Sequence, residues 1–281
     1  MLAQDRLNQY NPHMTMSLAS RRNPLVCKLE TFADLSDADT AVLERLTSRP
    51  RDYRAGEDLI REGDQPRHVF LLMEGWAYRY KVLANGKRQI LAYLLPGDFC
   101  DIHIFVLKYM DHNIALLNNA KVVAVPANDM LALMTDHPQI ERALWWATLV
   151  DEAILREWMT SMGQRDAFPR VAHILVELWL RMRMIGLADE NEFSLPLTQA
   201  EIADGLGLTP VHVNRTLQRL RAGGLISLDR KRLTIHDPER LMELSGFEPN
   251  YLHLDFNGKG VPCWRGDRYT TGRMPPMSLA S

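Results

Sequence analysis

Cysteine is scarce in this sequence, with only Cys27, Cys100 and Cys263 among 281 residues. A disulfide framework would need a denser, even-numbered set, and a four-cysteine zinc or iron–sulfur site needs one more thiolate than the sequence contains. We therefore expect free thiols that pack as small hydrophobic side chains, and we predict no metal and no cofactor.

Long apolar runs are also absent. No stretch approaches the roughly 18 apolar residues of a membrane-spanning helix, and residues 1–20 lack the apolar core of a secretory signal. We therefore expect a cytoplasmic protein without a membrane partner. Nucleophile–base, P-loop and Rossmann glycine patterns are missing, so an enzyme is not predicted. The net charge of −2, from 33 basic and 35 acidic side chains, excludes no class of partner.

Residues 51–126 have the pattern of short strands separated by glycines. The Asn85-Gly86 pair predicts a two-residue type I′ hairpin turn, in which both residues have positive φ. The turn-like spacing of the strands favours a small antiparallel roll, sandwich or barrel.

A long amphipathic helix is expected from about Pro138 to Met162, with Asp136 as its N-cap and Gly163 as its stop. One apolar stripe follows it at spacings of three or four residues: Leu144, Ala147, Val150, Ile154 and Trp158. The stripe either covers the β region alone or also pairs with the same helix of a second copy. We expect the second arrangement, a homodimer.

A break is predicted at Phe168-Pro169, followed by a helix to about Gly186 and a polar connector over 188–194. Beyond it, Thr198 and Glu201 form a capping box, Gly207 supplies a turn, and Thr209-Pro210 begins a second helix. Two short helices joined by a glycine turn are typical of a helix-turn-helix. Apolar residues at helical spacing leave six side chains on the outer face of the second helix: Val211, His212, Asn214, Arg215, Gln218 and Arg219.

Basic side chains gather around this second helix, with six basic residues and one acidic residue between positions 209 and 232. Arg215 suits guanine and Asn214 suits adenine, while the hydroxyls of Thr198 and Thr209 lie beside helix N-termini that can hold phosphate. A predicted hairpin over 225–236 forms a wing whose basic tip, which includes Lys231, would contact phosphates. The alternative is a solvated basic helix in an ordinary helical hairpin. We expect binding to double-stranded DNA.

Together these segments resemble the CRP/FNR family of bacterial transcription regulators over residues 29–241. The most specific are LTQAEIADGLGLTPVHVNRTLQRL (197–220), EGDQPRHVFLLMEGWAYRY (62–80) and LLPGDF (94–99). The resemblance implies an α+β fold: an antiparallel β-roll of the cyclic-nucleotide-binding type, a long dimerisation helix and a C-terminal winged helix-turn-helix. It also implies a homodimer on a pseudo-palindromic promoter site that recruits or blocks RNA polymerase. The corresponding layout is an irregular segment (1–25), the β-roll (26–135), the helix (136–165), the winged domain (166–245) and a disordered tail (246–281).

The resemblance assigns phosphate contacts to three residues and guanine reading to a fourth, namely Thr198, Gln199 and Thr209, and Arg215. Two positions depart from the family. Val211 stands where many relatives have a glutamate that reads cytosine, and Pro210 stands where the cyclic-AMP receptor has an arginine. The preferred half-site is therefore expected to differ, with His212 and Asn214 as further reading residues.

The resemblance places an effector pocket in the β-roll, around Gly97, Asp98, Cys100, Asp101, Ile102, His112 and Asn113. Relatives that bind cyclic nucleotide carry a glutamate for the ribose and an Arg-Ser pair for the phosphate. Here Ile102 and His112-Asn113 occupy those positions. A cyclic phosphate buried without its arginine would be an uncompensated charge. We therefore expect no cyclic-nucleotide binding, and the identity of any small-molecule effector stays open.

Two other classes also stay open. Asp101, His103 and His112 suggest a cupin-like metal site, in an enzyme or in a metal or redox sensor, although Asp-x-His replaces the His-x-His pair of such sites. In the other class, the helix-turn-helix of a dimeric interaction module binds protein. Elemental analysis and salt-sensitive binding to duplex DNA distinguish these classes from a DNA-binding regulator.

Overall fold

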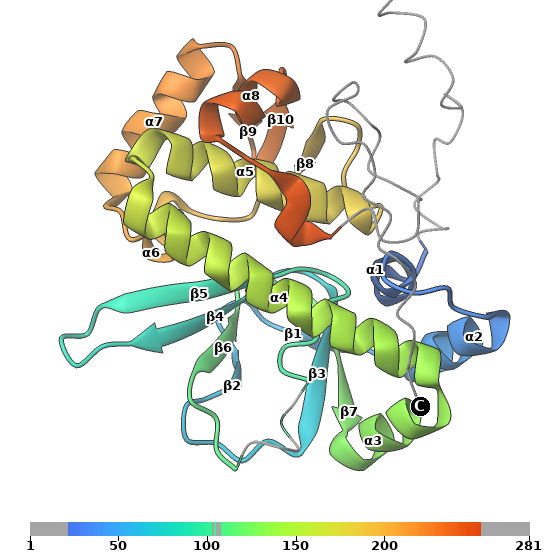
Figure 1. Ribbon diagram of the computed structural model, residues 1–281. Coiled ribbons are helices and arrows are strands. Elements are labelled where there is room, and N and C mark those ends of the chain that lie inside the picture. Colours follow the sequence, from blue (N-terminus) through green and yellow to red (C-terminus); the bar gives the residue numbers. More distant parts are fainter. Residues whose placement is uncertain (1–21, 103, 105–107, 254–281) are drawn as a thin grey trace, which may run out of the picture.

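The computed structural model describes residues 22–102, 104 and 108–253 (Figure 1). A β-roll and a C-terminal domain lie on opposite sides of one long helix, α4 (Pro138–Gln164), which crosses the molecule between them. The predicted α+β class, with an antiparallel roll, a long helix and a C-terminal helix-turn-helix, is confirmed.

Two antiparallel sheets form the β-roll, with strand orders β1-β7-β3 and β2-β6-β4-β5. The strands are β1 (Arg51–Tyr53), β2 (Asp58–Ile60), β3 (His68–Glu74), β4 (Ala77–Val82), β5 (Arg88–Leu94), β6 (Asn113–Leu116) and β7 (Ala120–Pro126). Three helices accompany them: α1 (Pro24–Glu30), α2 (Asp37–Leu46) and α3 (Ala127–Asp136). Most buried apolar residues of the two sheets pack into one core with α1 and the first turns of α4. Tyr78, Ile90 and Tyr93 instead pack in a second core with the rest of α4 and α5.

The turn between β4 and β5 differs from its prediction. Val82 and Arg88 are the last pair, so five residues connect the strands, and of Asn85 and Gly86 only the glycine has a positive φ. The Asn85 side chain instead accepts a hydrogen bond from the Lys87 backbone amide at 3.0 Å. The two-residue type I′ prediction is therefore wrong, because the asparagine stabilises a longer turn through its side chain.

Both predicted ends of α4 also differ. Asp136 belongs to α3, and His137 takes the N-cap position without a side-chain hydrogen bond. At the other end, Gly163 lies inside the helix, which gives way to extended backbone at Arg165.

The apolar stripe predicted as the dimer face is covered by the chain itself. Leu144, Val150, Ile154 and Trp158 are only 2–5% exposed, and Ala147 is half-buried. These side chains pack between the β-roll and the C-terminal domain. Of the two interpretations, the structure supports the one in which the stripe covers the chain's own core, so its four buried residues are unavailable to a second copy.

The C-terminal domain begins with α5 (Ala167–Met184), in which Pro169 occupies the first turn, so the break falls at Arg165-Asp166 rather than at Phe168-Pro169. The remaining elements are β8 (Glu192–Ser194), α6 (Gln199–Leu206), α7 (Pro210–Ala222), β9 (Ile226–Asp229), β10 (Arg232–Ile235), α8 (Pro238–Ser245) and a 3-10 turn, η2 (Pro249–Leu252). Strand β8 lies in the predicted polar connector. It is too short for a periodic pattern, but it pairs with β10 and buries Phe193.

The segment after α8 does not begin as a disordered tail. Phe247 and Leu252 are at most 1% exposed, and Tyr251 is 8% exposed. They pack in the core shared by α4 and α5. The expectation of disorder is therefore wrong for 246–252, and from residue 254 onward it lies outside the described residues, as do the predictions for residues 1–21.

Candidate nucleic-acid interface

The first helix of the predicted motif, α6, begins as its sequence indicates. The Thr198 hydroxyl accepts a hydrogen bond from the Glu201 amide at 3.2 Å, and the Glu201 carboxylate accepts one from the Thr198 amide at 2.7 Å. Gln199 is exposed at the first position of the helix. Gly207 ends the helix in the left-handed conformation, with φ of 63°. This turn sets the direction of α7.

The second helix, α7, has the predicted faces. Thr209 accepts a hydrogen bond from the His212 amide at 3.3 Å, and Pro210 follows as the first helical residue. Val213, Leu217 and Leu220 are at most 1% exposed. All six residues predicted for the outer face are exposed: Val211, His212, Asn214, Arg215, Gln218 and Arg219.

Two arginines of this helix differ in what they contact. Arg215 has no hydrogen-bond or ion-pair partner among the described residues. In contrast, the Arg219 guanidinium lies over the Phe168 ring, 4.2 Å from its centroid, in a cation–π contact with the start of α5. Arg215 can therefore reach outward without breaking an internal contact, whereas Arg219 cannot.

The predicted wing is present as β9 and β10, extended to three strands by β8. Its tip is Arg230-Lys231, and both residues have positive φ, 45° and 65°. Arg232, at the base of the tip, forms an ion pair with Glu192 on β8. Arg230 and Lys231 are therefore the exposed cations of the wing that have no side-chain partner in the described part of the chain.

Helix α6 also contacts the β-roll. The Tyr93 hydroxyl donates to the Glu201 carbonyl oxygen at 2.9 Å, and Arg88 forms an ion pair with Asp204 at 2.8 Å. A Cβ at Gly205 would collide with the Tyr93 hydroxyl, so glycine permits this close approach. Strand β5 thereby fixes α6, and through it α7, relative to the β-roll.

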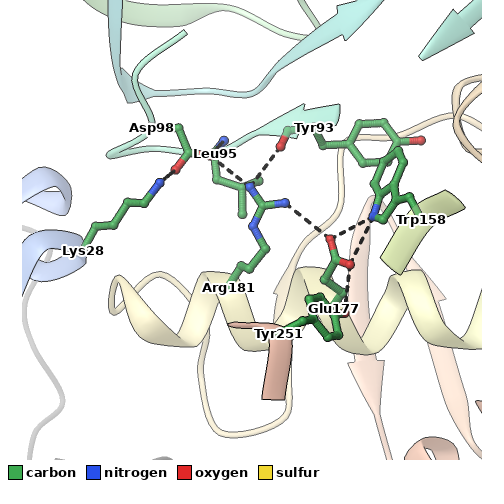
Figure 2. Close-up of polar contacts among 8 residues, drawn as sticks. All are labelled: Lys28, Tyr93, Leu95, Asp98, Trp158, Glu177, Arg181 and Tyr251. Atoms are coloured by element: carbon green, nitrogen blue, oxygen red, sulfur yellow. Dashed lines mark hydrogen bonds and ion pairs between the residues drawn. The ribbon is translucent and has the colours of Figure 1, made fainter. Parts of the chain in front are cut away.

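A buried chain of charges makes a second connection between the domains (Figure 2). Asp98 accepts from Lys28 of α1 at 2.6 Å and from Arg181 of α5 at 3.0 Å. Arg181 also lies 3.5 Å from Glu177, which accepts hydrogen bonds from Trp158 of α4 and Tyr251 of η2. Burial alone would raise the pKa of Asp98, but the charges of Lys28 and Arg181 outweigh burial and lower it. Asp98 is therefore an ionised structural link.

A cavity of about 530 Å³ lies between the β-roll and α4. Four predicted effector residues line it: Gly97, Asp101, Ile102 and His112. Three others do not. Asp98 is occupied by Lys28 and Arg181, Cys100 is fully buried, and Asn113 accepts a hydrogen bond from the Glu62 amide at 3.0 Å.

Sequence reasoning missed the cavity residues that come from elsewhere in the fold. Asp151 and Glu152 come from α4, and Arg79 comes from the middle of β4, where it donates to the Cys100 carbonyl oxygen at 2.8 Å. The alternating pattern of β4 could have placed Arg79 on one face of the sheet, but not beside this helix. Asp101 and His112 were suggested, with His103, as metal ligands. In the structure, His112 Nε2 lies 3.7 Å from Asp101 Oδ2.

No group of three or more potential metal ligands occurs among the described residues, which do not include His103. Both described cysteines are free; burial raises the pKa of Cys27 and raises that of Cys100 to about 12. None of the described helices combines the length and apolarity that a membrane span needs.

Comparisons with known proteins agree with this architecture. Residues 50–137 match the cyclic nucleotide-binding domain family, and residues 169–244 match the Crp-like helix-turn-helix domain family. The fold and the exposed basic helix define a DNA-binding transcription regulator, a class that is not enzymatic. The chain belongs to the CRP/FNR family of transcription regulators.

Individual relatives support the same membership. The transcriptional activator protein FnrL of Cereibacter sphaeroides is 30% identical over 200 residues, which are 70% of this chain and 80% of that protein. The nitrogen fixation regulation protein FixK of Bradyrhizobium diazoefficiens is 28% identical over 224 residues, covering 78% and 92% of the two chains. The solved structure of FixK2 from Bradyrhizobium japonicum has a TM-score of 0.63 and 26% identity, covering 71% of this chain and 98% of that one.

Proposed function

We propose that this regulator binds a pseudo-palindromic promoter site as a homodimer, with one α7 per half-site, and acts by recruiting or blocking RNA polymerase. The observation that carries the proposal is the exposed Arg215, which has no partner among the described residues and lies on the outer face of a capped helix. A guanidinium in this position suits bidentate pairing with guanine in the major groove. The phosphate backbone of the DNA is contacted by Thr198, Gln199, Thr209 and Lys231.

The dimer is proposed to form along a different face of α4 from the predicted one. Leu149, Leu155 and Met159 are 54%, 38% and 70% exposed, and Trp145 is 50% exposed. Trp145, Leu149 and Met159 fall in the series 145, 149, 152, 156 and 159, which alternates spacings of four and three residues as in a two-stranded coiled coil. Glu152 and Arg156 occupy the other two positions, and Leu155 lies beside the series. Leu149→Glu is expected to give a monomer in sedimentation equilibrium. The matched control is Leu83→Glu, because Leu83 is also 54% exposed but lies in the β4–β5 turn. A dimeric Leu149→Glu variant would contradict this interface.

The DNA-reading assignment is tested by comparing two substitutions on specific and nonspecific duplexes. Arg215→Ala is expected to cost about 1–3 kcal/mol at the specific site and to relax preference at one base pair. Lys231→Ala is expected to weaken binding about equally on all sequences. If Arg215→Ala keeps the wild-type sequence preference, α7 is not the reading helix.

The sensor cavity is proposed to exclude cyclic nucleotides. Four carboxylates line it, Asp101, Asp111, Asp151 and Glu152, against Arg79 and a lysine already paired with Asp98. These carboxylates would repel a cyclic phosphate, and the cavity also lacks the glutamate that binds the ribose in relatives. Calorimetry is expected to detect no micromolar affinity for cyclic AMP or cyclic GMP, and such an affinity would refute this part of the proposal.

A further inference from the structure

Val211 is exposed in a way that the polar contacts of the interface do not explain. It is 66% exposed at the second position of α7, and its exposed neighbours His212, Asn214 and Arg215 are all polar. Single apolar side chains on a surface are ordinary. This one, however, lies on the face that also presents Arg215, one helical turn away. Val211 is therefore placed to contact the base pairs that α7 is proposed to recognise.

The first turn of α7 presents this side chain rigidly. The Thr209 hydroxyl caps the His212 amide at 3.3 Å, and Pro210 fixes the preceding backbone angle. Valine itself has one strongly preferred rotamer in a helix. Two methyl groups are therefore held outward in a defined direction, with little conformational entropy left to lose on binding.

The geometry also limits which base pair Val211 can reach. One turn of helix rises 5.4 Å, and successive bases are 3.4 Å apart, so Val211 lies one or two base pairs from the pair that Arg215 contacts. Among base edges in the major groove, thymine alone presents an apolar group, its C5-methyl. Valine can neither donate nor accept a hydrogen bond, so it cannot replace a glutamate that accepts from cytosine.

We propose that Val211 reads the C5-methyl group of a thymine in each half-site, one or two base pairs from the guanine contacted by Arg215. This inference rests on the proposed function and adds the identity of a neighbouring base. It makes Val211 a specificity-determining residue rather than a neutral departure from the family pattern.

The test removes only the methyl group from the DNA. The preferred duplex is first obtained by selection with wild-type protein, and each thymine is then replaced in turn by deoxyuridine at constant salt. Wild type is expected to lose about three- to fivefold affinity at one position per half-site, the size of one buried methyl group. Val211→Ala is expected to bind the thymine and uracil duplexes equally. Val82→Ala, at a valine that is 51% exposed on β4, is the matched control and keeps the full difference.

A second variant tests the same contact in the opposite direction. Val211→Glu is expected to lose the uracil effect and to shift selection toward cytosine at that position. The inference is wrong if no thymine shows a methyl effect, or if Val211→Ala keeps that effect unchanged. In both cases sequence-specific binding would still support the proposed function. If wild type selects no sequence at all, the proposed function fails together with this inference.

Discussion

At the residue scale, the tip of the wing holds side chains in a backbone conformation that suits glycine. Arg230 and Lys231 both have positive φ, the requirement of a type I′ turn, in which Asn-Gly is the favoured pair. A non-glycine residue in this region costs of order 1–3 kcal/mol. We infer that the strain is retained because both side chains are basic and exposed where DNA phosphates would lie.

Replacing Lys231 with glycine should therefore separate stability from binding. Lys231→Gly is expected to raise the free energy of unfolding by about 1 kcal/mol, because it relieves the positive φ. It should also weaken binding to all duplexes and reduce the salt slope by about one. Urea unfolding and salt titrations measure the two effects. A less stable Lys231→Gly variant would show that the tip is not strained. An unchanged salt slope would show that Lys231 does not contact phosphate.

Residue types and spacing could predict much of the candidate DNA interface. They could not predict which basic side chains remain available to contact DNA. The caps of α6 and α7 and their buried faces depend on neighbours within four residues, so the sequence alone specifies them. Arg219 and Arg232 are engaged by Phe168 and Glu192, which lie on other elements of the domain. Only the tertiary structure brings those partners close, so the basic cluster appears larger in the sequence than in the fold.

At the element scale, the junction of α4 with α5 is stabilised by one carboxylate. Glu157 on α4 lies 2.7 Å from Arg165 in the connection and 3.3 Å from His173 on α5. Its contacts with His173 and Arg165 lower its pKa from 4.5 to about 2. Because the folded state holds the ionised form more tightly, the contribution is fully present above about pH 4.5 and is lost as pH falls toward 2.

Glu157→Gln should remove this pH dependence. The variant is expected to be less stable than wild type at neutral pH, and the difference should shrink between about pH 4.5 and pH 3. Urea unfolding at a series of pH values measures the difference. Glu243→Gln is the control, because its ion pair with Arg240 is exposed on both sides and should contribute little. A difference that stays constant with pH would mean that Glu157 acts only by packing.

The apolar stripe of α4 illustrates what periodicity can and cannot predict. Spacing identified Leu144, Val150, Ile154 and Trp158 as one buried side of the helix, and they are buried. It could not say what buries them, because a chain's own core and a second copy select for the same apolar residues. The face now proposed for the dimer carries Met159 beside Glu152 and Arg156, so its pattern is weaker in the sequence.

At the scale of the whole molecule, the two domains are joined through a carboxylate that the sequence assigns to something else. The resemblance places Asp98 in an effector pocket. In the structure it joins α1 to α5 through Lys28 and Arg181 (Figure 2). These residues are 70 and 83 positions away along the chain, and no local pattern pairs charges over such separations. The link could be found only once the fold was known.

Breaking this link should affect both domains together. Asp98→Asn keeps the shape of the side chain but leaves Lys28, which is 8% exposed, without a counter-charge. Because an uncompensated buried charge is costly, we expect a loss of about 3–5 kcal/mol in the free energy of unfolding. We also expect calorimetry to show one unfolding transition for wild type and two for the variant. Lys28→Met alone should cost less, because Asp98 keeps Arg181 as its partner.

The double variant Lys28→Met/Asp98→Asn distinguishes the charge effect from simple disruption. It removes the orphaned cation, while Arg181 still lies near Glu177 and donates to the Tyr93 carbonyl oxygen at 3.0 Å. It should therefore be more stable than Asp98→Asn alone, with a coupling free energy above about 1 kcal/mol in the double-mutant cycle. Additive losses, or an Asp98→Asn variant as stable as wild type, would mean that packing rather than this ion pair joins the β-roll to the C-terminal domain.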